Sequence, residues 1–153
     1  MGGEDVKMDP WSSNQSTDYS RIIEQFGLSS LNNLEINEPS KLHRRGIIFA
    51  HRDLGVILDA KKRGEDFGVL TGLMPSGKMH MGHSMVIDQV KWFQQQGGDV
   101  TIAVADLESQ ATRGVSLSKG REIALAEYVS NYAALGLDPE KTQVYFQSRR
   151  PIV

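Results

Sequence analysis

Residues 67–83, Phe-Gly-Val-Leu-Thr-Gly-Leu-Met-Pro-Ser-Gly-Lys-Met-His-Met-Gly-His, constrain the fold more than any other stretch of the chain. They open with an apolar run, Phe67 to Leu70, of the kind found in buried parallel strands. After His83, apolar residues recur at helical spacing. The loop between contains small and turn-forming residues: Gly72, Pro75, Ser76 and Gly77. A strand, a glycine-bearing loop and a helix start bring free N–H groups and the positive end of a helix dipole together, which predicts a nucleotide site.

Two nucleotide-binding motifs fit this loop. Gly72 and Gly77-Lys78 have the spacing of a P-loop, G-x-x-x-x-G-K-[ST]. The next residue is Met79, which has no hydroxyl for Mg²⁺, and Pro75 lacks an N–H for the phosphate cradle. A P-loop NTPase remains an alternative, in which hydrolysis would depend on Lys78.

The second motif is H-x-G-H, which His80, Gly82 and His83 match at every defined position. Two histidines at this spacing could also hold a metal ion. The sequence has no Cys and no third ligand adjacent to the pair, so we predict no metal site.

The flanks of the signature carry further motifs in a fixed order along the chain. They are Asp9-Pro10-Trp11, Asp18-Tyr19, Phe26-Gly27, the run from Arg45 to Asp53, Ile57-Leu58-Asp59-Ala60, Thr71-Gly72, Pro75-Ser76, Ala105-Asp106-Leu107-Glu108, and the run from Leu135 to Pro139. In these motifs the sequence resembles the class I aminoacyl-tRNA synthetases, and within them the archaeal and eukaryotic branch of the tryptophanyl-tRNA synthetases. The resemblance extends from about Asp9 to Arg149.

This resemblance implies activation of tryptophan by ATP, with Mg²⁺, followed by transfer to the 3′ end of tRNA(Trp). The amino-acid carboxylate attacks the α-phosphate, so the site must mainly stabilise charge on phosphorus. The implied catalytic residues are His80, His83 and Lys78. The implied ATP-binding residues are Pro75, Ser76, Gly77, Gly82 and, over the mouth of the site, Trp11. The implied substrate-binding residues are Leu70, Thr71, Gly72, Asp106 and Glu108, of which Glu108 would approach the tryptophan amino group.

The choice of amino acid depends on Leu70 and Ala103. Archaeal tyrosyl-tRNA synthetases share most of these motifs but place a Tyr where this chain has Leu70, which argues against tyrosine. The eukaryotic tryptophan enzymes also carry a Tyr there, and a polar residue where this chain has Ala103. A buried indole N–H without a partner costs about 1–3 kcal/mol, so we expect other groups to bind it. A tyrosyl-tRNA synthetase-like enzyme is therefore kept as an alternative.

Composition agrees with a water-soluble enzyme. The chain has 153 residues, of which 39% are apolar and 24% charged, and a net charge of −2. This length and apolar fraction suffice for a globular core. No long apolar run indicates a membrane span or a signal peptide, so we expect a cytoplasmic protein that does not bind a membrane.

The expected fold is α/β, a Rossmann-like doubly wound parallel sheet represented by its first βαβαβ half. Residues 1–40 are expected to form a partly disordered N-terminal extension that carries a helix from Tyr19 to Phe26. Residues 41–153 are expected to form the first half of a catalytic domain. Strands are expected at Gly46–Ala50, Phe67–Leu70, Asp99–Asp106 and Gln143–Gln147. Helices are expected from a cap at Asp53 through Lys62, from His83 to Gln96, and from a cap at Ser118 to Leu135.

The family's second signature, a Lys-Met-Ser-Lys-Ser loop, is absent from these 153 residues. We therefore expect a truncated catalytic fragment that does not charge tRNA by itself, with a homodimer forming in the full-length protein. Two further alternatives are a small H-x-G-H nucleotidyltransferase, which fits the length but not the flanking motifs, and a non-catalytic synthetase-derived binding module.

Overall fold

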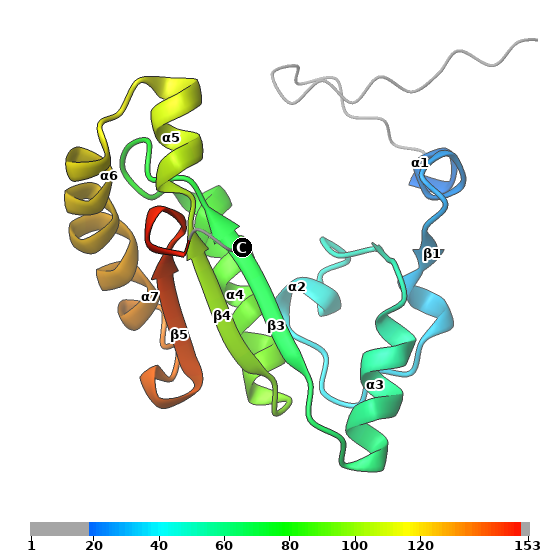
Figure 1. Cartoon of the computed structure of the whole chain (residues 1–153). Coiled ribbons are helices and arrows are strands. Elements are labelled where there is room, and N and C mark those ends of the chain that lie inside the picture. Colours follow the sequence, from blue (N-terminus) through cyan, green and yellow to red (C-terminus); the bar gives the residue numbers. More distant parts are fainter. Residues whose placement is uncertain (1–18, 151–153) are drawn as a thin grey trace, which may run out of the picture. The chain divides into compact units, whose positions relative to one another are not determined.

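The computed structural model describes residues 19–150, and the chain divides into two compact units, residues 1–59 and 60–153 (Figure 1). The expected boundary after residue 40 falls inside the first of these units. The reason is a two-stranded antiparallel sheet, in which β1 (Ser29–Ser30) pairs with β2 (Ala50–His51) and so joins the two sides of that boundary.

The first unit also contains short helices. The expected helix at its start is present as α1 (Tyr19–Gln25), and the Tyr19 ring packs on Phe49 with 4.3 Å between ring centroids. A 3₁₀ turn, η1 (Leu31–Asn33), and the one-turn helix α2 (Lys41–Arg44) follow. The expected strand at Gly46–Ala50 is wrong except at its last residue. The N–H groups of Ile47 and Ile48 both donate to the Leu42 carbonyl, so this segment closes α2 instead of pairing in a sheet.

Helix α3 (Leu54–Arg63) crosses the boundary between the units. It ends before Gly64, as expected, and Gly64 has the positive φ of +72° that favours glycine at a helix end. At its start, Asp53 has φ +56°, and the Leu54 N–H donates to His51 Nδ1 at 3.2 Å. The ring of His51 therefore caps this end, where Asp53 was expected to do so.

The second unit is built on three parallel strands in the order β3 (Gly68–Leu73), β4 (Asp99–Val104) and β5 (Thr142–Phe146). Helix α4 (Met81–Gln95) connects the first two strands. The second connection contains α5 (Asp106–Arg113), α6 (Leu117–Ile123), a π-helical segment η2 (Ala124–Val129), α7 (Ser130–Ala134) and the 3₁₀ turn η3 (Pro139–Lys141). A last 3₁₀ turn, η4 (Gln147–Arg149), follows β5. This is the expected first βαβαβ half of a Rossmann-like sheet.

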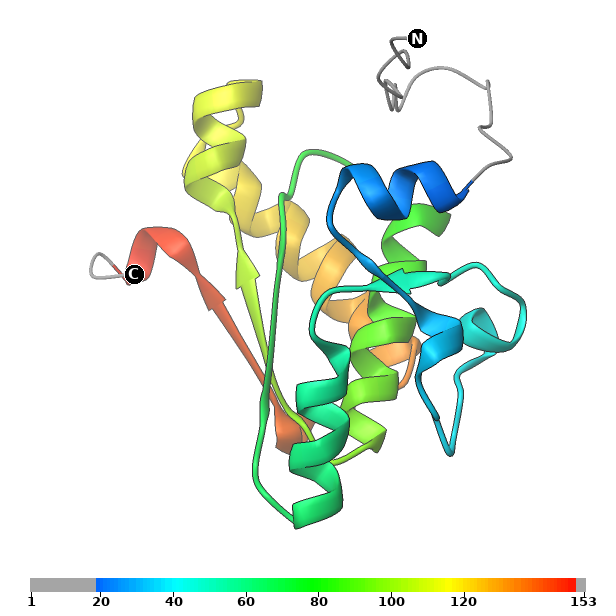
Figure 2. The ribbon, with the colours of Figure 1, turned by 90° about the vertical axis from the view of Figure 1, so that its right-hand side faces the viewer.

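Helices α4 and α6–α7 lie against one face of this sheet (Figures 1 and 2). Alternate strand residues point toward them and form the core, to which the central strand β4 contributes Val100 and Ile102. The core residues come from α4, β4 and the second connection: Ile87, Val90, Val100, Ile102, Tyr128, Tyr132 and Leu137.

Several element boundaries differ from those expected. Strand β4 ends at Val104 and Asp106 opens α5, whereas a strand through Asp106 was expected. Strand β3 continues three residues past Leu70 because its pairing with β4 runs on to Leu73↔Val104, so Gly72 lies in the strand and not in the loop. Helix α4 begins at Met81, not His83. Helix α6 begins at Leu117 because Ser116, not Ser118, is its N-cap and accepts the Lys119 N–H at 3.3 Å. Within residues 19–150, no helix is long and apolar enough to cross a bilayer.

Candidate active site

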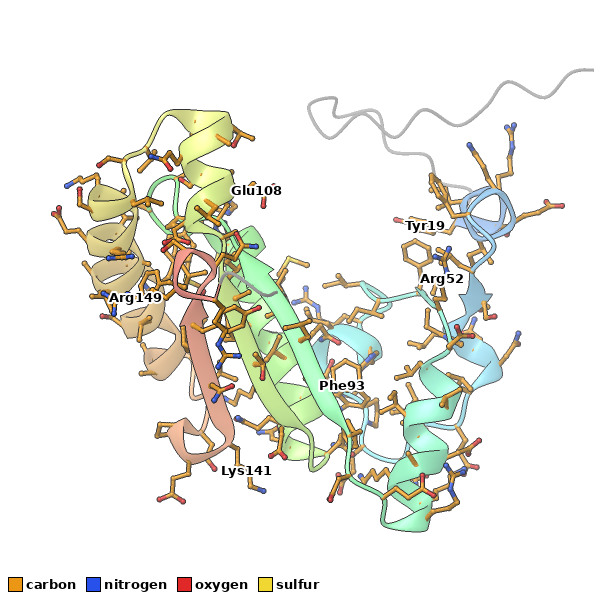
Figure 3. All side chains as sticks on the ribbon, viewed as in Figure 1. Tyr19, Arg52, Phe93, Glu108, Lys141 and Arg149 are labelled. Carbon is orange, nitrogen blue, oxygen red and sulfur yellow. The ribbon has the colours of Figure 1, made fainter. Side chains whose placement is uncertain are left out.

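The expected site residues of the loop and of α5 lie beyond the carboxyl ends of the parallel strands of the second unit. The loop 74–80 leaves β3, α5 follows β4 directly, and η4 follows β5. Figure 3 shows Glu108 and Arg149 toward this end of the sheet and Lys141 at the opposite end. Ligands of open parallel sheets bind beyond the carboxyl ends of the strands, so this edge is the candidate site.

The His-x-Gly-His residues form the first turn of α4. His80 is the N-cap, and its carbonyl accepts the His83 and Ser84 N–H groups at 2.9 and 3.2 Å. The His80 N–H donates in return to His83 Nδ1 at 3.2 Å, and the two ring centroids are 3.8 Å apart. Because Nδ1 is an acceptor, a neutral His83 carries its proton on Nε2. The helix turn thus orders both rings and fixes the tautomer of one.

The charge state of His83 follows from its surroundings. Burial lowers the pKa of His83, and the neighbouring His80 lowers it further. The ring is therefore neutral at pH 7 and can donate a hydrogen bond from Nε2 to a ligand oxygen.

The two glycines of the loop and signature differ in their surroundings. A Cβ on Gly82 would lie 3.1 Å from Cε1 and 3.2 Å from Nδ1 of His80. The missing side chain at Gly82 therefore leaves the room that the His80 ring occupies. A Cβ on Gly77 would meet nothing within 4 Å. The space over Gly77 is open to a ligand.

The loop before the signature is held from inside the protein. The Ser109 hydroxyl donates to the Pro75 carbonyl at 3.0 Å, and the Tyr128 hydroxyl donates to the Met74 carbonyl at 3.2 Å. Pro75, Ser109 and Tyr128 are all buried. Neither Ser109 nor Tyr128 stands out in the sequence, because Tyr128 continues the apolar pattern of its helix and Ser109 is one of many serines.

Asp106 is buried at the start of α5, and its carboxylate is at the centre of a polar cluster. Its Oδ1 accepts the N–H groups of Ser148 and Leu107 at 3.0 and 3.1 Å, and its Oδ2 accepts the Ser148 hydroxyl at 2.5 Å. Arg121 donates to the same hydroxyl at 3.0 Å and places its Nε 4.0 Å from Oδ2. Arg121 and Ser148 were not among the expected site residues, since only the fold brings them to Asp106.

The proposed substrate residues of β3 lie on both faces of the sheet. Register pairs Gly72 with Ala103 and Ala103 with Tyr145, so these three residues share the face without helices, together with Leu70. The Leu70 side chain is 73% exposed there. Thr71 points to the opposite face, so one ligand on the open face cannot contact the side chains of both Leu70 and Thr71.

The remaining expected residues are placed as follows. Lys78 is exposed in the loop, and Glu108 is exposed on α5. Trp11 lies outside the described residues.

Three residues separate Gly77 from the start of α4, whereas a P-loop lysine opens its helix, and this argues against the P-loop alternative. No group of three or more His, Asp or Glu side chains in the described part of the chain could hold a metal ion.

Comparison with known proteins yields one family. A family model described as "tRNA synthetases class I (W and Y)" matches residues 61–151. The tryptophan–tRNA ligase of Methanosarcina acetivorans is 46% identical over 146 residues, which are 94% of this chain and 33% of the relative. That of Aeropyrum pernix is 45% identical over 150 residues, 94% of this chain and 40% of the relative.

Solved structures agree with the sequences. The crystal structure of the tryptophanyl-tRNA synthetase from Aeropyrum pernix superimposes with a TM-score of 0.83 at 45% identity, over 94% of this chain and 41% of that one. A tryptophanyl-tRNA synthetase from Encephalitozoon cuniculi bound to tryptophan matches with a TM-score of 0.74 at 29% identity, over 87% and 42%. The chain therefore spans well under half the length of these relatives.

Proposed function

The chain belongs to the class I tRNA synthetases of the W and Y family, and from this membership we propose that it supplies the ATP-binding part of a tryptophan-activating site. The complete reaction would be the ATP-dependent formation of tryptophanyl-adenylate and transfer of tryptophan to tRNA(Trp). The similarity to tryptophan–tRNA ligases, which runs over nearly the whole chain, supports tryptophan as the substrate.

The observation that carries this proposal is the first turn of α4. There the helix N-terminus carries its free N–H groups, the His80 N–H orders the His83 ring, and the nearby Gly77 has open space where a Cβ would lie. These groups are donors whose positions are set before a ligand arrives. Preorganised donors of this kind stabilise the charge that develops on a phosphate oxygen during adenylate formation.

Each side chain would act as a hydrogen-bond donor or a point charge. His83 would donate from Nε2 in its neutral form, and His80 beside it would contact phosphate or ribose oxygens. Lys78 is exposed next to Gly77 and would neutralise phosphate charge. Ser76 would add its hydroxyl. Mg²⁺ would be held mainly by the ATP phosphates, as is usual for this ion.

Tryptophan would bind on the open face of the sheet. Leu70 and Ala103 provide apolar contact there, and the Tyr145 ring lies beside Ala103 with the Arg150 guanidinium 4.5 Å over it. Glu108, which is exposed on α5, would attract the amino group of the substrate. Asp106, whose carboxylate oxygens are already bonded within the protein, would support the start of α5 and hence Glu108.

The test is amino-acid-dependent exchange of pyrophosphate into ATP. We would compare the 153-residue chain with a chimera in which the remaining sequence of the Aeropyrum pernix relative follows Val153. Exchange with tryptophan in the chimera, and none with the 153 residues alone, is the expected result. The chimera carrying His80→Ala and His83→Ala should lose at least about 100-fold in exchange rate, the magnitude typical of a lost transition-state donor.

Two outcomes would change the assignment. Exchange with tyrosine and not tryptophan would keep the family and reverse the interpretation of Leu70. A chimera that folds and binds tRNA but exchanges with neither amino acid would favour a non-catalytic binding module.

A further inference from the structure

We propose that Tyr128 and Ser109 are positioning residues that hold the Met74–Lys78 loop in the shape that binds ATP phosphates. The inference rests on the proposed function for its ligand, but the loop-holding role can be measured without any ligand. Neither residue contacts the open side of the loop where a nucleotide would lie, so both would act through the backbone of that loop.

Tyr128 connects two parts of the site. Its hydroxyl donates to the Met74 carbonyl at 3.2 Å, and its ring meets the His83 ring edge-on with 5.5 Å between centroids. The side chain is buried, at 2% exposure, so its position is set by the core around it. One residue thereby sets both the start of the loop and one side of the signature histidine.

Ser109 holds the next carbonyl of the same loop. Its hydroxyl donates to the Pro75 carbonyl at 3.0 Å, and the residue is completely buried. Helix α5, which carries it, is tied at its first residue through the Asp106 carboxylate to Ser148. A Cβ added at Gly120 of α6 would lie 3.8 Å from Cγ of Pro75, so α6 also packs beside the loop.

These two contacts turn successive carbonyls of the loop toward the protein interior. The N–H groups of Gly77 and Lys78, which follow, have no backbone partner among residues 19–150. A loop whose carbonyls face inward and whose next N–H groups are unpaired presents donors to an anion, and carbonyl oxygens facing the same anion would repel it. Holding the carbonyls is therefore what makes the loop fit a phosphate.

Tyr128 lies in a π-helical segment of its helix. Residues Ala124–Val129 are π-helical between two α-helical stretches, and the Ser130 hydroxyl donates to the Leu125 carbonyl at 3.0 Å, five residues back. One additional residue in a helix rotates the side chains that follow it by about 100° relative to an unbroken helix. Single π turns are common at functional sites, and Tyr128 lies inside this one.

The test compares Tyr128→Phe and Ser109→Ala with Tyr132→Phe in the 153-residue chain. Tyr132 is the matched control, because it is buried in the same core but its hydroxyl has no hydrogen-bond partner in the described structure. The amide order parameters of Ser76 and Gly77, measured by ¹⁵N relaxation, should fall from about 0.85 to below about 0.6 in the first two variants. They should be unchanged in Tyr132→Phe.

ATP affinity provides the second measurement. We expect the dissociation constant for ATP to rise about 5- to 10-fold in Tyr128→Phe and in Ser109→Ala, in line with the loss of one hydrogen bond, and to stay unchanged in Tyr132→Phe. Unchanged order parameters in both variants, or an equal effect of Tyr132→Phe, would overturn the inference. A wild-type chain that binds no ATP would count against the proposed function, while the order parameters would still decide the role of Tyr128 and Ser109.

Discussion

At the scale of single residues, the two histidine rings of the candidate site have different surroundings. His83 is oriented by the N–H of His80 and shielded by the ring of Tyr128, whereas His80 occupies the space that Gly82 leaves. Hydrogen-bond direction and local burial thus distinguish two side chains that are chemically identical. The sequence motif alone assigns them the same role.

The pKa of His83 gives a direct prediction. Burial and His80 lower it in the folded state, so the fold favours the neutral ring. The resulting contribution to stability is fully present above the unfolded pKa of 6.5 and is lost as the pH falls through the lower folded pKa. ATP should raise the pKa of His83, because phosphate charge favours the imidazolium form, and should therefore bind more tightly as the pH falls.

Titration of the histidine ring protons by NMR measures this shift. His43 is the internal control, because burial also lowers its pKa but it lies in the first unit and caps α2. A pKa of His83 that does not respond to saturating ATP would contradict the assignment of His83 to the phosphate site.

Gly82→Ala should separate stability from ligand binding. Alanine in a helix favours folding by about 0.5–1 kcal/mol over glycine, but the new Cβ would press on the His80 ring. We expect unchanged or increased stability in urea unfolding and ATP binding weakened several-fold. Gly55→Ala, in α3, is the control: its Cβ would meet only Leu34 at 3.6 Å, and it should leave ATP binding unchanged.

At the scale of elements, the buried side chain of Gln94 in α4 contacts the turn before β5, although α4 itself leads into β4. Gln94 is 6% exposed, and its amide donates to the carbonyls of Asp138 and Lys141 and to the Thr142 hydroxyl. Its oxygen accepts the Asp138 N–H at 2.8 Å. The turn that leads into β5 is therefore ordered by a residue of α4 and not only by its own sequence.

Gln94→Leu should be strongly destabilising. The substitution keeps the size of the side chain but removes the partner of the Asp138 N–H and of the Lys141 carbonyl, which costs about 3 kcal/mol. Urea unfolding measures the change. Gln95→Leu, at the next and exposed position, should change the free energy of unfolding by less than about 0.5 kcal/mol. Equal effects of the two substitutions would show that the hydrogen bonds of the buried Gln94 amide do not contribute to the free energy of unfolding.

At the scale of the whole molecule, residues far apart in the sequence meet at the carboxyl edge of the sheet. Asp106, Arg121 and Ser148 come from α5, α6 and η4 and form one polar cluster. The pairing of β4 with β5 ends at Val104↔Phe146, and this cluster continues the connection between the two segments beyond that point.

Asp106→Asn should weaken this cluster and lower the free energy of unfolding by about 2 kcal/mol. The amide has one acceptor oxygen in place of the two that now accept the Ser148 hydroxyl and two N–H groups, and it carries no charge opposite Arg121. Thermal unfolding would measure the loss. Glu108→Gln, which neutralises an exposed acid on the same helix, should have little effect on stability. A comparable loss there would show that the charge of α5, and not the cluster, determines the free energy of unfolding.

The sequence predicted the class of fold and the position of the signature because both depend on local patterns. Apolar runs separated by glycine-bearing turns specify strands and helices, and the spacing of His80, Gly82 and His83, together with the flanking motifs, is the local pattern on which the predicted site rests. It failed at Gly46–Ala50, which has a strand-like composition but closes α2, and at Ser118, where the neighbouring Ser116 is the cap. Local propensity does not decide between two adjacent partners for the same N–H.

Only the tertiary structure decided which residues support the site. Tyr128 and Ser109 reach the loop at Met74 and Pro75 from 54 and 34 residues away, and Ser148 reaches Asp106 from 42 residues away. No local pattern encodes such distances, because the crossovers of a parallel sheet bring together chain segments whose separation depends on the length of the intervening helices. The sequence determined which residues lie at the edge of the sheet, and the packing of helices on that sheet determined what holds them in place.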